Sequence, residues 1–146
     1  MSYLHVQALE SIDNEFSAAA SALAYVARVW HELGDQPEVH GVHLPHVRQA
    51  LDNLETTYII RRFSQYEAIL HDHLSTSYPR LRVPRTAEAL INRVALRERL
   101  PASIRDAAQA VRELRNALVH RRMTPVSSRS LREVMAALNR FLAQLP

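Results

Sequence analysis

Apolar residues recur along this chain at the spacing of helices. In the first segment they follow one another at alternating intervals of three and four, which aligns them on one side of a helix that ends at Gly34. We therefore predict a helix over about 2–33, with a packing seam as the favoured interpretation over a ligand stripe. The seam residues are Leu9, Ile12, Phe16, Ala19, Leu23, Val26, Trp30 and Leu33.

The second segment, about 46–77, carries two apolar faces. A helix turns through about 100° per residue, so the two sets lie roughly opposite each other. A helix that is apolar on two sides is usually central and covered on both, by other helices or by a second subunit. The first face comprises Val47, Leu51, Leu54 and Tyr58, and the second comprises Ile60, Phe63, Leu70 and Leu74.

Three shorter segments complete the pattern, at about 86–99, 101–122 and 130–145. Pro101 suits a first helical turn, and Ser130-x-x-Glu133 has the spacing of a capping box. The two glycines and seven prolines fall between or at the ends of the segments, and no segment alternates with a period of two. The fold prediction is all-α: an up-and-down bundle of four to five helices forming one domain over 1–146.

Composition narrows the classes of function. The chain has no cysteine, which excludes disulfides, thiolate metal sites and cysteine nucleophiles and makes the cytoplasm the expected location. No signal peptide or membrane span is expected from its apolar runs. Residues 1–60 carry eight acids and two arginines, whereas 61–146 carry sixteen arginines and seven acids. This polarity favours contact with a polyanion. The chain has no lysine, however, so a genome whose base composition favours arginine codons explains the many arginines equally well.

The most chemically specific element lies at the end of the fourth segment, in Arg-Asn-Ala-Leu-Val-His. Asn116 and His120 are four apart and share a helix face, whereas Arg115 is rotated by about 140° from His120, toward the apolar side. An arginine at the margin of a core needs an anion or a carboxylate as its partner. Histidine titrates near neutrality, so His120 can move protons while a guanidinium holds a phosphate.

This element resembles the RxxxxH motif of the HEPN superfamily, small helical domains that often act as metal-independent ribonucleases. The resemblance matches Arg115, Asn116 and His120 to the family pattern and implies an HEPN-like bundle that cleaves RNA, with His120 as general acid or base and Arg115 stabilising the phosphate. It also implies Asn116 as a group that orients His120 or binds substrate, pairing of two chains as a homodimer, no metal or other cofactor, and a role as a toxin or in phage defence. A protein inhibitor or antitoxin belongs to the same set of implied partners, but Arg122 stands where some toxin members have tyrosine, which weakens that reading.

A second, weaker resemblance concerns the stretch Arg61–Glu67, which is similar to the second-helix region of RiboL-PSP-type members. The residues expected to contact RNA are Arg61, Arg62, Tyr66, Glu67, Arg121 and Arg122. Arg61, Arg62 and Tyr66 are candidates for a phosphate-binding wall with a stacking ring, though Tyr66 is equally a core candidate. Glu67 is expected near a buried face, paired with Arg115 or the 61–62 arginines, or else exposed at its edge.

Other interpretations remain open at this point. A non-catalytic helical module of the same fold would bind RNA, a nucleotide or a protein without turnover. A purely structural protein would use the charge polarity only for head-to-tail contacts. His40, His43 and His46 offer three imidazoles for zinc, but a solvated connection is favoured because a loop gives no fixed geometry.

Overall fold

The computed structural model describes residues 3–32, 38–39, 42–120 and 130–146. Within them the chain forms five helices: α1 (Tyr3–Glu32), α2 (Leu44–Ser77), α3 (Ala87–Arg97), α4 (Ala102–Val119) and α5 (Leu131–Leu142). The predicted all-α bundle is confirmed, and each helix begins and ends close to its expected bounds. One small element was not expected: β1 (Glu38–Val39) pairs antiparallel with β2 (Val42–His43).

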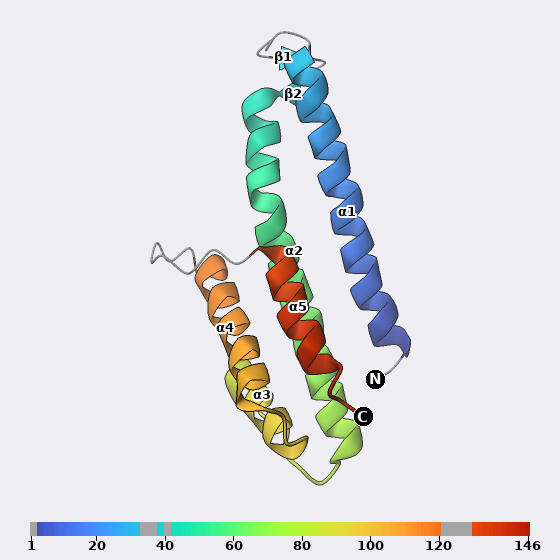
Figure 1. Ribbon diagram of the computed structural model, residues 1–146, viewed down its shortest axis with the longest axis vertical. Helices are drawn as coiled ribbons and strands as arrows, with labels where there is room; N and C mark the ends of the chain where they lie inside the picture. Colours follow the sequence, from blue (N-terminus) through green and yellow to red (C-terminus); the bar gives the residue numbers. More distant parts are fainter. Residues whose placement is uncertain (1–2, 33–37, 40–41, 121–129) are drawn as a thin grey trace.

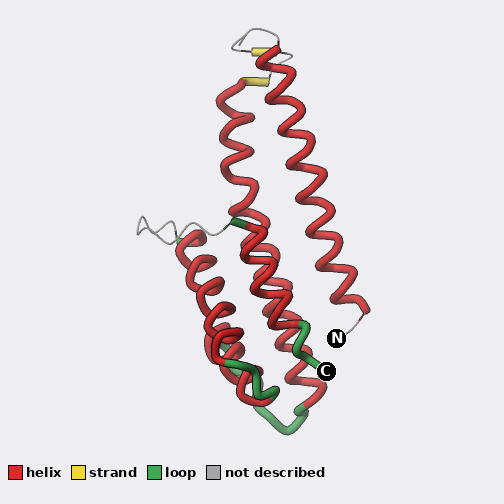
Figure 2. The backbone as a smooth tube through the Cα atoms, viewed as in Figure 1, coloured by secondary structure: helices red, strands yellow, loops and turns green. Residues whose placement is uncertain are grey.

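The two long helices form a hairpin whose far end extends beyond the rest of the molecule. α1 and α2 run antiparallel, and the β1–β2 ladder lies at the tip of this hairpin (Figure 1). The three shorter helices gather beside the second half of α2, so that the bundle occupies one end of the molecule and a two-helix arm the other (Figure 2). Of the described helices, none is long and apolar enough to cross a membrane.

Both faces of α2 are covered within the chain, as expected for a central helix. Its first half contacts α1, and its second half also contacts α3, α4 and α5. The core therefore centres on α2, where Phe63, Tyr66 and Leu70 are fully buried against residues such as Ile91 and Phe141. Because the second face of α2 is filled by the chain's own helices, it offers no free apolar surface for a second subunit.

Leu33 of the seam predicted on α1 lies outside the described residues, and the rest of the seam is only partly buried. Leu9 and Trp30 are buried, while Phe16 and Leu23 are half-buried and Val26 is exposed over 36% of its surface. The physical reason is the arm, because outside the bundle α1 has only α2 to cover it. Periodicity predicted the face that packs, but not how much cover that face receives.

Local capping fixes the helices that carry the candidate site. The predicted capping box at the start of α5 is present, with Ser130 and Glu133 bonded to each other's backbone N–H groups. Between α3 and α4, Arg99 adopts φ 53°, and the Leu100 N–H donates to the Ala95 carbonyl at 2.9 Å. This is a Schellman-type helix end, which turns the chain so that α4 packs back along α3 and α2.

Candidate functional site

The predicted catalytic residues lie at the C-terminal end of α4. His120 is the C-terminal capping residue of that helix, and its side chain is exposed. Its backbone N–H donates to the Asn116 carbonyl at 3.0 Å. The imidazole is thus presented to solvent at a fixed helix end, one turn after Asn116.

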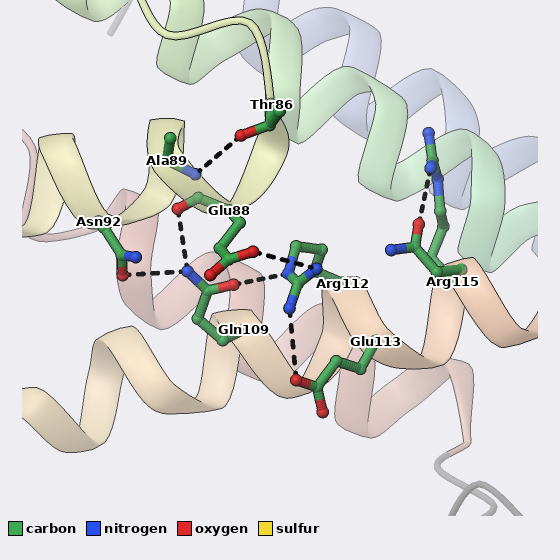
Figure 3. A network of polar contacts seen from close by, with 9 residues as sticks. Thr86, Glu88, Ala89, Asn92, Gln109, Arg112, Glu113 and Arg115 are labelled. Atoms are coloured by element: carbon green, nitrogen blue, oxygen red, sulfur yellow. Dashed lines mark hydrogen bonds and ion pairs between the residues drawn. The ribbon is translucent and has the colours of Figure 1, made fainter.

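Arg115 is held on the opposite side of this turn by three neighbours. One terminal nitrogen, Nη1, donates to Asn116 Oδ1 at 2.9 Å, and the other, Nη2, lies 3.4 Å from Glu67 Oε2. The guanidinium carbon lies 5.5 Å from the centroid of the Phe63 ring. Figure 3 shows Arg115 extending from α4 toward α2. The side chain remains 28% exposed, so its cation is oriented by the protein but not sealed from solvent.

The Asn116 side chain orients Arg115. Its Oδ1 accepts from the neighbouring guanidinium, and its link to His120 runs through the backbone. The amide was expected to orient the imidazole or to bind RNA, and in the structure it instead fixes the Arg115 cation. A role of this amide in RNA binding stays a prediction. The buried Arg115 Nε has no partner among the described residues, so this guanidinium is under-satisfied as it stands.

Glu67 confirms the predicted ion pair with Arg115. The carboxylate is 27% exposed, and burial raises its pKa, an effect that the nearby Arg115 only partly offsets. Glu67 also lines a hollow of about 270 Å³ between α2 and the start of α3, together with His71, Arg85 and Thr86. Glu67 therefore lies at the wall of an open hollow, whereas Arg115 does not line it.

Arg62 and Tyr66 lie inside the protein, away from any surface that RNA can reach. Arg62 is 2% exposed and donates to the Leu9 carbonyl, the Asp13 carboxylate and Asn139 Oδ1, which joins α1, α2 and α5. Tyr66 is fully buried, so the core alternative holds for this ring, and burial raises the pKa of its hydroxyl. A wall of Arg61, Arg62 and a stacking Tyr66 is therefore not what the fold builds.

Arg61 alone of that group is on the surface. It makes a bidentate ion pair with Glu15 at 2.7 and 2.8 Å, and its guanidinium lies 5.0 Å from the Tyr58 ring centroid. This hydrogen-bonded pairing lowers the pKa of Glu15. Arg121 and Arg122, the other predicted RNA contacts, lie outside the described residues.

The structure also brings together polar groups that the sequence did not single out. Between α3 and α4, Arg112 Nε donates to Gln109 Oε1 at 2.7 Å, and Gln109 Nε2 donates to Asn92 Oδ1 and the Glu88 carbonyl (Figure 3). This network lies at the wall of a hollow of about 730 Å³. Only the three-residue spacing of Gln109 and Arg112 signalled it, because Asn92 comes from another helix.

The histidines considered for zinc are arranged differently from a chelate. His40 lies outside the described residues, and the His43 and His46 rings meet edge to face with centroids 5.3 Å apart. Among the described residues, no group of three histidine or carboxylate side chains is placed to hold a metal ion. The interpretation of these residues as a metal site thus has no geometric support in that part of the chain.

Comparison with known proteins adds no relative: no family model, no curated protein and no solved structure matches this chain. Any assignment of function therefore rests on the residues and their geometry, together with the resemblance of the α4 element to the HEPN motif.

Proposed function

We propose that the protein is a metal-independent endoribonuclease of HEPN type, with its chemistry at the end of α4. The observation that carries this proposal is the placement of an exposed imidazole, His120, at the end of α4, five residues after an oriented and partly exposed guanidinium, Arg115. An imidazole that can exchange protons and a cation that fits phosphate oxygens are the two groups that cleavage by a ribose 2′-hydroxyl needs.

In the proposed reaction, the 2′-oxygen of RNA attacks the adjacent phosphorus and the bond to the 5′-oxygen of the next nucleotide breaks. A base removes the 2′-proton, and an acid supplies a proton to the leaving oxygen. The products are a 2′,3′-cyclic phosphate and a 5′-hydroxyl end. Arg115 would stabilise the charge that develops on the non-bridging oxygens, and His120 would serve as one of the two proton-transfer groups.

A single imidazole does not readily act as base and acid at the same moment, so we propose that two chains pair and contribute one His120 each. Because the second apolar face of α2 is filled by the chain's own helices, this pairing needs another surface. We propose the end of α4 as the pairing surface, because the large apolar side chain of Val119 is 45% exposed there, directly beside His120. Covering it with a second copy would bring two α4 ends together and bury apolar area.

Glu67 has a defined part in this proposal. Its contact with Arg115 is long, at 3.4 Å, and the Asn116 amide holds the same guanidinium from another side. We infer that Glu67 is a positioning residue. It orients the Arg115 guanidinium in the free protein, and a bound phosphate replaces it as the partner of that cation. A protein inhibitor or antitoxin that presents a carboxylate would compete for the same cation.

The second candidate is a non-catalytic module that binds RNA or a protein partner. It is favoured by the same ion pair, because Glu67 and Asn116 already engage both terminal nitrogens of Arg115. In that case binding would occur without turnover, and its affinity would fall steeply with salt if RNA is the ligand.

The experiment that separates these candidates is cleavage of a labelled RNA pool in EDTA by the wild type and by His120→Ala, Arg115→Ala and Arg140→Ala. The last variant removes an exposed arginine on α5 and serves as a matched control. We expect His120→Ala and Arg115→Ala to cut at least a hundredfold more slowly than the wild type, and the control to cut at the unchanged rate. Mass spectrometry is expected to show cyclic phosphate ends on the products.

Equal cutting by all four preparations would indicate a contaminating nuclease and would remove the enzyme proposal. Binding of RNA by the wild type without any cutting would select the second candidate. Thermal melting of each variant checks that the fold is retained, which is expected because His120 is exposed and Arg115 lies at the edge of the core.

A further inference from the structure

The stretch 78–99, which comprises the connection before α3, α3 itself and the two residues after it, forms a strongly cationic part of the surface. Six exposed arginines occur here against two glutamates, and none of the six forms an ion pair with a described residue. Glu98 is turned inward, where it pairs with His73, and Glu88 lies 3.9 Å from Arg112 of α4. The six arginines are Arg80, Arg82, Arg85, Arg93, Arg97 and Arg99.

Within this surface lies a hollow that is lined by both apolar and cationic side chains. Its volume is about 300 Å³, and it is lined by Tyr78, Pro79, Arg80, Leu81 and Arg97. An aromatic ring, a proline and a leucine offer contact to a flat, weakly polar group, and the two arginines that line the same hollow offer contact to an anion. A nucleotide combines these two chemical features in one molecule.

The tyrosine of this hollow is held in a fixed orientation. Its hydroxyl donates to Glu98 Oε1 at 2.9 Å, and His73 Nε2 lies 2.8 Å from the same oxygen. The carboxylate is thereby anchored between α2 and α3, and its hydrogen bond raises the pKa of Tyr78. The Arg97 guanidinium lies 5.6 Å from the ring centroid, within the range of a cation–π contact. Ring and cation are thus preorganised, which lowers the entropic cost of binding a base against them.

We propose that the hollow of Tyr78, Arg80 and Arg97 binds one base of a single-stranded RNA, while the neighbouring arginines contact the flanking phosphates. This inference rests on the proposed function in that RNA is the ligand, and it adds a second point of attachment away from α4. The hollow lies at the C-terminal end of α3, whereas the Glu67–Arg85 hollow lies at its N-terminal end. At about 1.5 Å per residue, α3 separates them by roughly 16 Å, so one strand of several nucleotides can contact both.

Stacking and unpaired cations favour single strands over duplexes. Bases of a duplex are already stacked on one another and present only their edges, whereas a single strand exposes the face that Tyr78 and Arg97 can cover. Recognition through a ring face and phosphates is also tolerant of sequence, so the site is expected to secure the strand and leave the choice of cleavage position to α4.

The test uses the full-length protein and a fluorescein-labelled, 2′-O-methylated single-stranded oligonucleotide, which binds like RNA but lacks the attacking hydroxyl. Fluorescence anisotropy is expected to show at least fivefold weaker binding for Tyr78→Leu and for Arg97→Ala. Tyr78→Phe, which keeps the ring, and Arg140→Ala, which removes a cation elsewhere, are expected to stay within twofold of the wild type. Arg97→Ala should also reduce the slope of log affinity against log salt by about 0.7.

The inference is overturned if Arg97→Ala and Tyr78→Leu bind the oligonucleotide as tightly as the wild type does. It is also overturned if the wild type binds a duplex of the same length more tightly than the single strand, or does not bind the single strand at all. Arg97 is exposed, so its variant stays informative even if Tyr78→Leu loses stability. Because the probe cannot be cut, the result is separate from catalysis: a Tyr78-dependent affinity in a protein that cuts no RNA would retain this site and reject the nuclease. If both variants cut RNA normally and bind the oligonucleotide as the wild type does, the nuclease is retained and this site is rejected.

Discussion

The buried Arg62 gives the sharpest prediction about what stabilises this fold. Replacing it with methionine keeps much of the apolar stem but removes the charge and all four of its hydrogen bonds, which run to the Leu9 carbonyl, both Asp13 oxygens and Asn139. Arg62 is 2% exposed, so water cannot replace these partners at its own position. The variant leaves the Asp13 carboxylate without its counter-ion.

The magnitude follows from how deeply each partner lies. Breaking a fully buried ion pair costs about 3–5 kcal/mol, because one charge stays behind without compensation. The Asp13 side chain is 30% exposed and regains part of its hydration, which places the expected loss nearer to about 3 kcal/mol. At roughly 2–4 °C per kcal/mol for a chain of this size, the melting temperature should fall by about 6–12 °C.

Urea unfolding followed by circular dichroism measures this loss directly. The double variant Arg62→Met with Asp13→Leu removes both charges, and its destabilisation should be smaller than the sum of the two single changes by at least about 1 kcal/mol. A loss below about 1 kcal/mol for Arg62→Met, or additive losses in the double variant, would refute the argument that this ion pair joins α1, α2 and α5.

Four further predictions concern single sites. Arg61→Ala should lower the melting temperature much less than Arg62→Met and less still at high salt, because its ion pair with Glu15 is exposed; an equal loss in thermal melts would contradict this. Burial raises the pKa of Glu67, so the folded state binds that proton more tightly than the unfolded chain does, and stability should fall as pH rises through the interval just above 4.5; Glu67→Gln should lack this component in urea titrations from pH 4 to 7. Ser130→Ala removes a helix cap and should cost about 1 kcal/mol in the same assay, with Ser130→Asp close to wild type. Arg99→Gly relieves a left-handed backbone position and should raise the unfolding free energy by about 1 kcal/mol, whereas no gain would mean that the αL strain is already offset.

Periodicity along the chain was sufficient to predict the helices. The apolar intervals of α1, the two faces of α2 and the capping box of α5 are properties of local sequence, because helix formation depends on neighbours three and four residues apart. The same local logic placed Arg115 at the margin of the core and made Glu67 a candidate partner, and the ion pair between them is present. For these features the information lies within one or two turns of a helix.

Several features of the candidate site came only from the packing of helices against one another. Arg61 and Arg62 are adjacent and chemically identical, yet one is exposed and the other is 2% exposed, because a rotation of about 100° points the second into the junction with α1 and α5. The Asn116 amide oxygen accepts a hydrogen bond from Arg115, although the four-residue spacing suggested a contact with His120. The cluster of His73, Tyr78 and Glu98 joins residues up to 25 positions apart, for which no periodic signal exists.

The sequence by itself thus determined the helical class, the order and approximate ends of the helices, and the position of the Arg115–His120 element late in the chain. Tertiary structure alone decided how far α1 runs beyond the bundle, which arginines are internal, and which arginines of α3 form no ion pair with the described residues. The reason is physical: helix formation is governed by near neighbours in the chain, whereas burial and charge pairing are set by whichever helix packs alongside, and that neighbour comes from a distant part of the sequence.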